Sequence, residues 1–445
     1  MSQTAKKMGV VQLTIITAVN MMGSGIIMLP AKLASVGTIS ILSWLVTAVG
    51  SMCLAYCFAQ CSMFSREQGG MGGYADNAFG KAGNFLCNYT YSFSLIIANV
   101  AIAISAVGYG TEFMDMKLSA LGVGLATIAT LWITSVLNFG GAGITGKIGS
   151  VTVWGVIIPV VGISLIGWFW FDPTLYINSW NPHGLPFMEG VSESITLTLW
   201  SFLGLESACA NSDAVENPEK NVPIAVLGGT LGAAIVYIAS TNVMAGIVPI
   251  GQLAASNAPF GFVFAHMFSP IAGKIVMGLM TLACLGSLLG WQFTTAQVLK
   301  SSADVGYFPR VFSKVTRANA PVAGMIVMTI IETVIAFATI SPSLMEQFSA
   351  IVDLAVVTNL VPYVLSMAAL PIILHKAGVS KQKRFTTHAV NLIATAYSFY
   401  ALYACGEFAL AYGGLVTFLG WTFYGFIANR FEIRRPEEKV TTSQT

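Results

Sequence analysis

The chain has 445 residues, of which 55% are hydrophobic and 9% are charged, whereas about 25% of residues are charged in an average soluble domain. This composition excludes an ordinary soluble protein and predicts an all-α, polytopic membrane protein. The net charge of +2 is small and is spread over short loops, so it does not indicate binding to nucleic acid.

Twelve apolar segments follow one another along the chain, and each approaches or exceeds the ~20 residues that a helix needs to cross a bilayer. They cover residues 9–33, 38–62, 84–111, 120–139, 149–171, 192–212, 222–249, 271–298, 322–341, 347–374, 388–406 and 409–429. The first lacks a small-residue cleavage site after a short apolar core, so we interpret it as a span rather than a removable signal. The glycine-rich stretch 62–84 predicts a short helix between spans.

Lysine and arginine residues predict the orientation of these spans. If both termini are cytoplasmic, only Lys32, Lys117 and Lys274 lie outside. The remaining 18 basic residues then lie inside: Lys6, Lys7, Arg66, Lys81, Lys147, Lys220, Lys300, Arg310, Lys314, Arg317, Lys376, Lys381, Lys383, Arg384, Arg430, Arg434, Arg435 and Lys439. Because cytoplasmic loops are enriched in Lys and Arg, this asymmetry favours two cytoplasmic ends, with residues 430–445 as a polar tail.

Two segments contain small and polar residues where a continuous apolar helix is expected. The first carries Gly23-Ser24-Gly25 and the sixth carries the stretch from Ser201 to Ser207. Both interruptions fall about fifteen residues into their segments, five helices apart, which is typical of the inverted repeats of transporters. The alternative for Gly23-Ser24-Gly25 is a stripe of small residues that lets membrane helices pack closely.

Glu206 is the acidic residue inside the second interruption. A charged side chain near the bilayer centre costs roughly 2.5–3.5 kcal/mol on insertion scales, so it normally faces a partner or a pathway. We interpret Glu206 as a binding site for a cation that crosses the membrane; a structural carboxylate tied to another helix is the alternative. Glu332 and Asp353 also lie in or near spans, and their roles stay open.

Trp200 and Trp291 are candidates for holding an ammonium group, since an indole face attracts a cation. Each on its own is also typical of an ordinary core residue. The four histidines occupy loops or segment ends, and no cysteine pair has zinc-site spacing with a histidine, so we predict no metal. The sequence from Gly141 to Ile148 resembles a phosphate loop but lacks its final Ser or Thr, and we predict no cofactor.

Four motifs match a known family: NMMGSGI at 20–26, TLWSFLGLESACAN at 198–211, ENPEKNVPIA at 216–225 and GSLLGWQF at 286–293. The chain resembles, from end to end, the basic amino acid–polyamine antiporters of the amino acid–polyamine–organocation superfamily. The resemblance implies a leucine-transporter-type fold in one transporter domain, 1–445. Its first five-helix repeat would be 9–171, the inverted second repeat 192–374, and two further helices 388–429.

The resemblance also implies a substrate site between the broken first and sixth helices. Substrate binding would fall to Gly23, Ser24, Gly25, Asn99, Trp200, Ser201, Gly204, Glu206 and Trp291. Gating would fall to Tyr91, Trp200, Glu206 and Tyr363, with Tyr91, Glu206 and Tyr363 closing the site towards the cytoplasm. One departure is Asp76, which stands where the resemblance predicts a glutamate at the inner mouth, and its role stays open.

The function implied is exchange of cytoplasmic putrescine for external ornithine, and also putrescine uptake, across the inner membrane of a bacterium. Exchange of lysine for cadaverine, exchange of arginine for agmatine, and proton-coupled amino acid transport are alternatives that need a similar site. The resemblance also raises a homodimer as an expectation. An intramembrane hydrolase using Ser24 would need a histidine or lysine partner that the spans lack, so we predict no enzyme. A channel is the remaining alternative.

Overall fold

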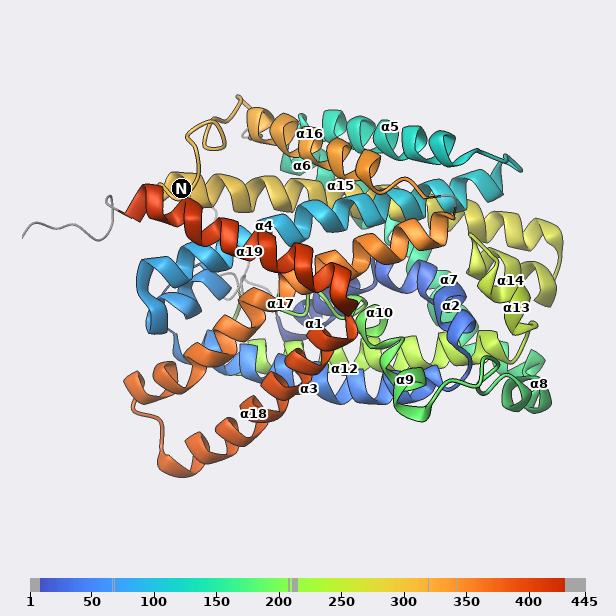
Figure 1. Ribbon diagram of the computed structural model, residues 1–445, viewed down its shortest axis with the longest axis horizontal. Helices are drawn as coiled ribbons and strands as arrows, with labels where there is room; N and C mark the ends of the chain where they lie inside the picture. The colour runs from blue at the N-terminus through green and yellow to red at the C-terminus, as the bar shows by residue number, and fades with distance from the viewer. Residues whose placement is uncertain are drawn as a thin grey trace, which may run out of the picture.

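The computed structural model describes residues 9–65, 67, 69–206, 209, 215–318, 320–341 and 343–428, apart from the side chains of Ile16, Ser24 and Pro218. All regular elements in this part of the chain are helices, as the composition predicts (Figure 1). They are α1 (Val10–Met21), α2 (Ser24–Val36), α3 (Ser40–Phe64), α4 (Met71–Phe113), α5 (Ala120–Asn138), α6 (Ala142–Thr152), α7 (Trp154–Ile166), η1 (Gly167–Trp170), α8 (Pro173–Asn178), α9 (Phe187–Ser192), α10 (Ile195–Trp200), α12 (Pro218–Ala245), α13 (Ile250–Ala254), α14 (Pro259–Met267), α15 (Pro270–Asp304), α16 (Val322–Ala338), α17 (Leu344–Lys376), α18 (Lys381–Ala404) and α19 (Gly406–Ile427).

Among the described residues, eight helical stretches are long and apolar enough to cross a membrane, and α1 with α2 would make a ninth. The eight are α3, α4, α5, α6 to η1, α12, α15, α17 and α19. Three of the predicted segments are not among these spans, because each lacks the length or the apolar composition for a different reason. In the sixth, the described residues 195–206 form the short α10 followed by turns; α16 has 17 residues, and α18 begins with charged residues. The all-helical, multi-span architecture is confirmed, and the count of twelve stays a prediction.

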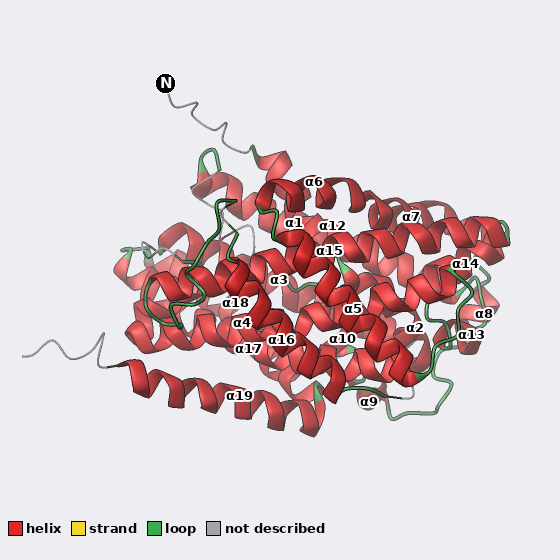
Figure 2. Cartoon of the chain, turned by 90° about the horizontal axis from the view of Figure 1, so that it is seen from above, coloured by secondary structure: helices red, strands yellow, loops and turns green. Residues whose placement is uncertain are grey.

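The long helix α4 forms the centre of the bundle and packs along α17 and α15. It kinks at Gly80, whose φ of +61° is a conformation that side chains rarely adopt. The kink separates a short arm that starts at Met71 from the span itself, so the helix predicted within 62–84 is present. At the periphery, α19 runs along the outside of the bundle (Figure 2).

The long connection between η1 and α10 is held against the end of α2. The backbone N–H groups of Thr38 and Ile39 donate to the carbonyls of Ser179 and Trp180, each at 2.9 Å. Glycine at position 37 permits this close approach, because its φ is +113° and a β-carbon there would lie 2.6 Å from the side chain of Pro182. The short helices α8, α13 and α14 gather at the same end of the molecule (Figure 1).

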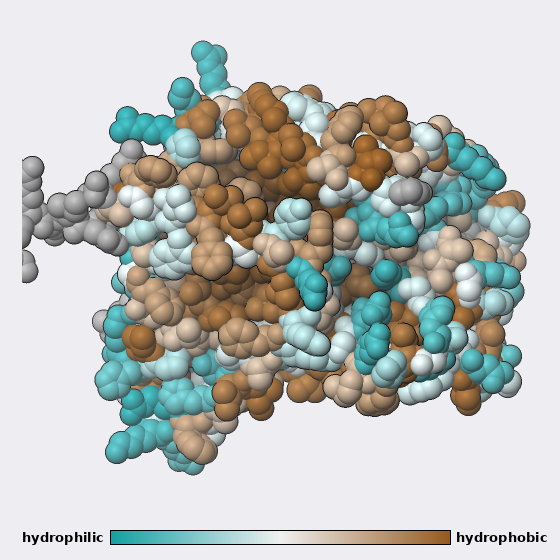
Figure 3. Space-filling view, in the orientation of Figure 1, coloured by the Kyte–Doolittle hydropathy of each residue, from teal (hydrophilic) through white to brown (hydrophobic). Residues whose placement is uncertain are grey.

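Large apolar side chains cover much of the outer surface. Phe169 is 86% exposed, Phe426 79% and Leu392 72%, which is the pattern of a protein whose sides face lipid rather than water. Figure 3 shows hydrophobic side chains over the middle of one face and hydrophilic ones gathered mainly towards its two ends. The chain therefore presents an apolar belt between polar ends.

Candidate functional site

The two predicted interruptions lie against each other in the bundle. The first separates α1 from α2 at Met22 and Gly23, where the helix axis bends by 48°. The second begins where α10 ends at Trp200 and continues as turns to Glu206. A β-carbon on Gly25 would lie only 2.9 Å from Cα of Ser201, so glycine permits this close approach. Ser207, the last residue of the predicted interruption, lies outside the described residues.

We expect Gly25→Ala to lower transport and to destabilise the protein by about 1–3 kcal/mol, the usual cost of overpacking a tight contact. The atom it would strike belongs to the backbone, which cannot rotate away. Thermal unfolding of purified protein and substrate counterflow would measure both effects. Gly162→Ala in α7 is the matched control, because nothing lies within 4 Å of its β-carbon position. Equal behaviour of the two variants would contradict the proposed contact.

Glu206 is held by three hydrogen bonds from three segments. The phenol of Tyr91 on α4 donates to Oε1 at 3.1 Å, and the phenol of Tyr363 on α17 donates to Oε2 at 2.5 Å. The backbone N–H of Gly204 also donates to Oε2, at 3.1 Å. Glu206 is 5% exposed. These donors compensate part of the cost of burying the carboxylate, and they join α4, α17 and the turn after α10 at one point.

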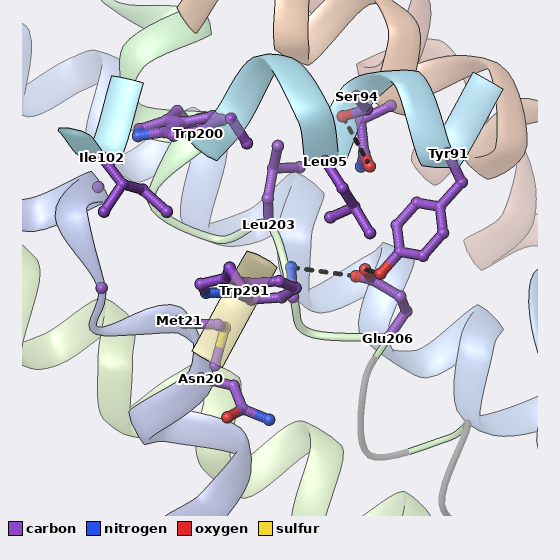
Figure 4. A pocket seen from close by; sticks show the side chains of 15 residues that line it. Asn20, Met21, Tyr91, Ser94, Leu95, Ile102, Trp200, Leu203, Glu206 and Trp291 are labelled. Atoms are coloured by element: carbon purple, nitrogen blue, oxygen red, sulfur yellow. Dashed lines mark hydrogen bonds between the residues drawn. The ribbon is translucent and has the colours of Figure 1, made fainter. Parts of the chain in front are cut away.

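A cavity of about 50 Å³ lies beside this carboxylate, between the two interruptions (Figure 4). That is room for a few water molecules. Its described lining comprises Asn20, Met21, Gly23, Gly25, Tyr91, Ser94, Leu95, Ala98, Ile102, Trp200, Leu203, Gly204, Glu206, Trp291 and Asn359. Glu206 is the one charged residue among them. A small chamber with a single carboxylate and mostly apolar walls is complementary to a cation that carries a hydrocarbon chain.

The two tryptophans that line the chamber differ in their surroundings. Trp200 is 7% exposed, and its indole N–H has no hydrogen-bond partner among the described residues. Trp291 lies in α15, and its indole packs against the backbone of Gly204. A β-carbon on Gly204, whose φ is +101°, would lie 3.5 Å from the indole. Figure 4 shows Trp291 between Trp200 and Glu206. An aromatic face is therefore available along the chamber.

Asn99 is not among the residues that line the chamber. It is fully buried in α4, and its side-chain N–H₂ donates to Oε1 of Glu332 on α16 at 2.8 Å. The amide of Gln292 on α15 donates to the other oxygen of Glu332 at 2.9 Å. Glu332 therefore links α4, α15 and α16 behind the wall that carries Trp291, and it engages the side-chain N–H₂ of Asn99.

The other predicted site residues are distributed around the same region. Ser201 is buried, and its hydroxyl donates to the carbonyl of Leu197 at 3.5 Å. Tyr363 reaches Glu206 without lining the chamber. The backbone of Ser24 begins α2, and its side chain lies outside the described part of the structure. Asp76 lies in the N-terminal arm of α4, before the kink at Gly80, and accepts hydrogen bonds from Lys81 at 2.7 Å and from Asn84 at 2.9 Å.

Sequence reasoning missed several lining residues, notably Ser94 and Asn359. The hydroxyl of Ser94 donates to Oδ1 of Asn359 at 3.3 Å, across the boundary between α4 and α17. Ser94 follows Tyr91 by three positions and Asn359 precedes Tyr363 by four. Residues at these spacings share a helix face, so helical periodicity around the two tyrosines could have identified both.

The described residues contain no group of three or more His, Cys, Asp or Glu side chains that could hold a metal ion. What the chamber offers is recognition: one carboxylate, two indoles and the irregular backbone of two broken helices.

The profile of the amino acid permease family matches residues 8–424. The chain belongs to the amino acid permease family. This permease is 66% identical to the putrescine transporter PotE of Escherichia coli strain K12, over 98% of the chain and 99% of that protein. It is 65% identical to PotE of Haemophilus influenzae, over 98% and 100%. Identity to the cadaverine/lysine antiporter of E. coli K12 is 32%, over 95% of both proteins.

Family membership confirms the resemblance inferred from the four motifs. It also makes the permease a multi-pass membrane transporter rather than an enzyme. The greater identity to the putrescine transporters extends over nearly the full length, so it is not confined to one motif or one half of the chain.

Proposed function

We propose that this permease exchanges cytoplasmic putrescine for external ornithine, and that it can also take up putrescine. One observation carries the proposal. Glu206 is the one charged residue among the described residues that line a chamber between two broken helices. The high identity to two proteins named as putrescine transporters supports the choice of substrate. A carboxylate attracts one ammonium group, and the apolar wall accommodates the methylene chain.

Each part of the site then has a role in binding. Glu206 binds an ammonium of the substrate, while Trp200 and Trp291 flank the methylene chain. Backbone N–H groups at Gly23, Ser24 and Gly25 donate to the carboxylate of ornithine, which the positive end of α2 also attracts. Ser201 and Gly204 shape the opposite break, and Asn99 supports the wall through Glu332. Putrescine has no carboxylate, so only ornithine uses the glycine turn fully.

The gate is the hydrogen-bonded group of Tyr91, Glu206 and Tyr363. An ammonium that reaches Glu206 competes with the two phenols that now occupy its oxygens. Loss of those bonds would release α4 from α17 at this point and open the path towards the cytoplasm. Trp200 closes the opposite side of the chamber. In this proposal substrate binding and opening are coupled through the same carboxylate.

The proposed architecture is a leucine-transporter-type fold of twelve helices with broken helices 1 and 6. Residues 9–171 and 192–374 form the two inverted repeats, and residues 388–429 add two helices. Both termini lie in the cytoplasm of a bacterium, and the protein lies in the inner membrane. The apolar outer faces of the bundle are compatible with a homodimer.

Substrate competition in proteoliposomes tests the proposal. Putrescine and ornithine should compete more strongly than the pairs lysine with cadaverine and arginine with agmatine. Saturable counterflow that requires substrate on the far side would also exclude a channel. Preference for lysine and cadaverine would contradict the proposed substrate pair and match the name of the 32% identical cadaverine/lysine antiporter.

Membrane voltage should change the exchange rate. Putrescine carries two positive charges at neutral pH and ornithine one net charge, so export of putrescine for ornithine moves one charge outward. An inside-negative potential opposes this by about 2.3 kcal/mol per 100 mV. In vesicles loaded with putrescine and supplied with external ornithine, an inside-negative potential should slow exchange and an inside-positive potential should accelerate it.

A rate that ignores voltage in both directions would contradict one-for-one exchange of these substrates without a proton. Measuring proton flux in the same vesicles distinguishes the two causes. A proton that moves with the cycle would preserve the substrate pair, whereas electroneutral exchange without proton movement would exclude it.

A further inference from the structure

An apolar groove opens on the outer face of the bundle, away from the substrate chamber. It has a volume of about 350 Å³ and lies among α4, α15, α16, α19 and the connection after α15. Its described lining comprises Phe85, Tyr89, Ser92, Phe93, Ile96, Leu299, Tyr307, Phe308, Pro309, Phe312, Met328, Ile331, Phe423, Phe426 and Ile427. The groove is seven times larger than the substrate chamber, and it contains no charged residue among those described.

Buried aromatic side chains form the floor of the groove, and its rim is open. Phe85, Tyr89 and Tyr307 line it and form a buried cluster with Tyr424, each at most 6% exposed. Phe85 and Tyr89 stack with ring centroids 5.8 Å apart. On the rim, Phe426 is 79% exposed. A preformed apolar channel with an open side suits a flexible hydrocarbon chain that enters from the surrounding lipid.

A polar depression adjoins one end of the groove. It measures about 520 Å³, is lined in part by Asp304 and Arg310, and shares Phe308 and Pro309 with the groove. The charge of Asp304 is balanced, because Lys300 donates to it at 2.6 Å. Arg310 is exposed and has no acidic partner within salt-bridge distance among the described residues. The depression therefore carries uncompensated positive charge.

The same connection adds further positive charge near this end of the bundle. Lys314 and Arg317 are both exposed and follow Arg310 within seven positions. Burial and the nearby charge of Asp76 raise the pKa of the Tyr307 phenol to about 12, so it is neutral at physiological pH. It adds no negative charge to the groove.

We infer that the groove and the depression together bind one anionic phospholipid of the membrane, with an acyl chain against the aromatic floor and the phosphate at Arg310. Apolar helix surface with adjacent basic residues at a membrane face is the arrangement that recognises anionic headgroups. The continuity of the two cavities through Phe308 and Pro309 joins both parts of such a molecule. The inference needs only a membrane-embedded bundle and does not depend on the substrate pair.

Native mass spectrometry of the purified full-length protein tests this inference, with dioleoylphosphatidylglycerol and dioleoylphosphatidylcholine as probes. The wild type should retain phosphatidylglycerol more strongly. Arg310→Ala should weaken its retention roughly five-fold, as expected for one basic residue at an anionic surface, and should leave phosphatidylcholine unchanged. Arg384→Ala is the control, because this half-buried arginine lies in a different part of the chain and does not line the depression.

A second pair of variants tests the groove itself. Ile331→Trp places an indole in the groove and should reduce retention of both lipids, whereas Ile330→Trp, on the same helix but outside the groove, should not. Equal retention of the two lipids by the wild type, or no effect of Arg310→Ala, would overturn the inference. A change of oligomeric state in Ile331→Trp with unchanged lipid retention would also overturn it, in favour of a second copy of the chain.

Discussion

Glu206→Gln is expected to lower putrescine counterflow about 30-fold or more, because losing one partner of a buried charge pair costs about 2–5 kcal/mol. The substitution keeps the volume of the side chain but removes the one charge among the described residues that line the chamber. Uptake of labelled putrescine into proteoliposomes measures the effect. The amount of reconstituted protein must be matched between variants, so that transport per molecule is compared.

Glu332→Gln provides the matched control for this experiment. Glu332 is also fully buried, yet it does not line the chamber. We expect it to retain much more transport than Glu206→Gln. If a well-folded Glu206→Gln protein transports putrescine at the wild-type rate, the carboxylate is structural and serves only to join α4 to α17.

Glu332→Leu is expected to destabilise the protein by roughly 2–6 kcal/mol. The side-chain amides of Asn99 and Gln292 would each lose one of two acceptors, because Asn99 also donates to the hydroxyl of Thr295 and Gln292 to the carbonyl of Leu131. Each buried N–H left unsatisfied costs about 1–3 kcal/mol. The apparent midpoint of thermal unfolding, measured in one detergent for all variants, should fall clearly below that of the wild type.

Glu332→Gln should lose less stability than Glu332→Leu. Its amide oxygen still accepts one hydrogen bond, and its N–H₂ can donate to the carbonyl oxygen of Asn99, which has no partner among the described residues. Equal unfolding midpoints for Glu332→Leu and the wild type would show that α4, α15 and α16 do not depend on this carboxylate. A substrate effect without a stability effect would instead assign Glu332 to transport.

The local features of the site could be predicted because they depend on residue type at each position. Apolar runs identified the helices, and glycine with small polar residues identified the break at Gly23 and the turns after Trp200. Glu206 was conspicuous because a carboxylate is costly in an apolar segment. The pairing of Glu206 with Tyr91 and Tyr363 was expected only through the family resemblance, because the residues that pair are 115 and 157 positions apart.

By itself, the sequence of this protein determined that the chain is helical with several membrane spans, where two apolar segments break, and which buried carboxylate lies at a break. Tertiary packing alone decided that Asn99 faces Glu332 instead of the chamber, that Ser94 meets Asn359, and that Arg310 adjoins an apolar groove. The physical reason is that hydropathy and backbone propensity are properties of neighbouring residues. Which side chains meet depends on how helices distant in the chain rotate and pack against one another.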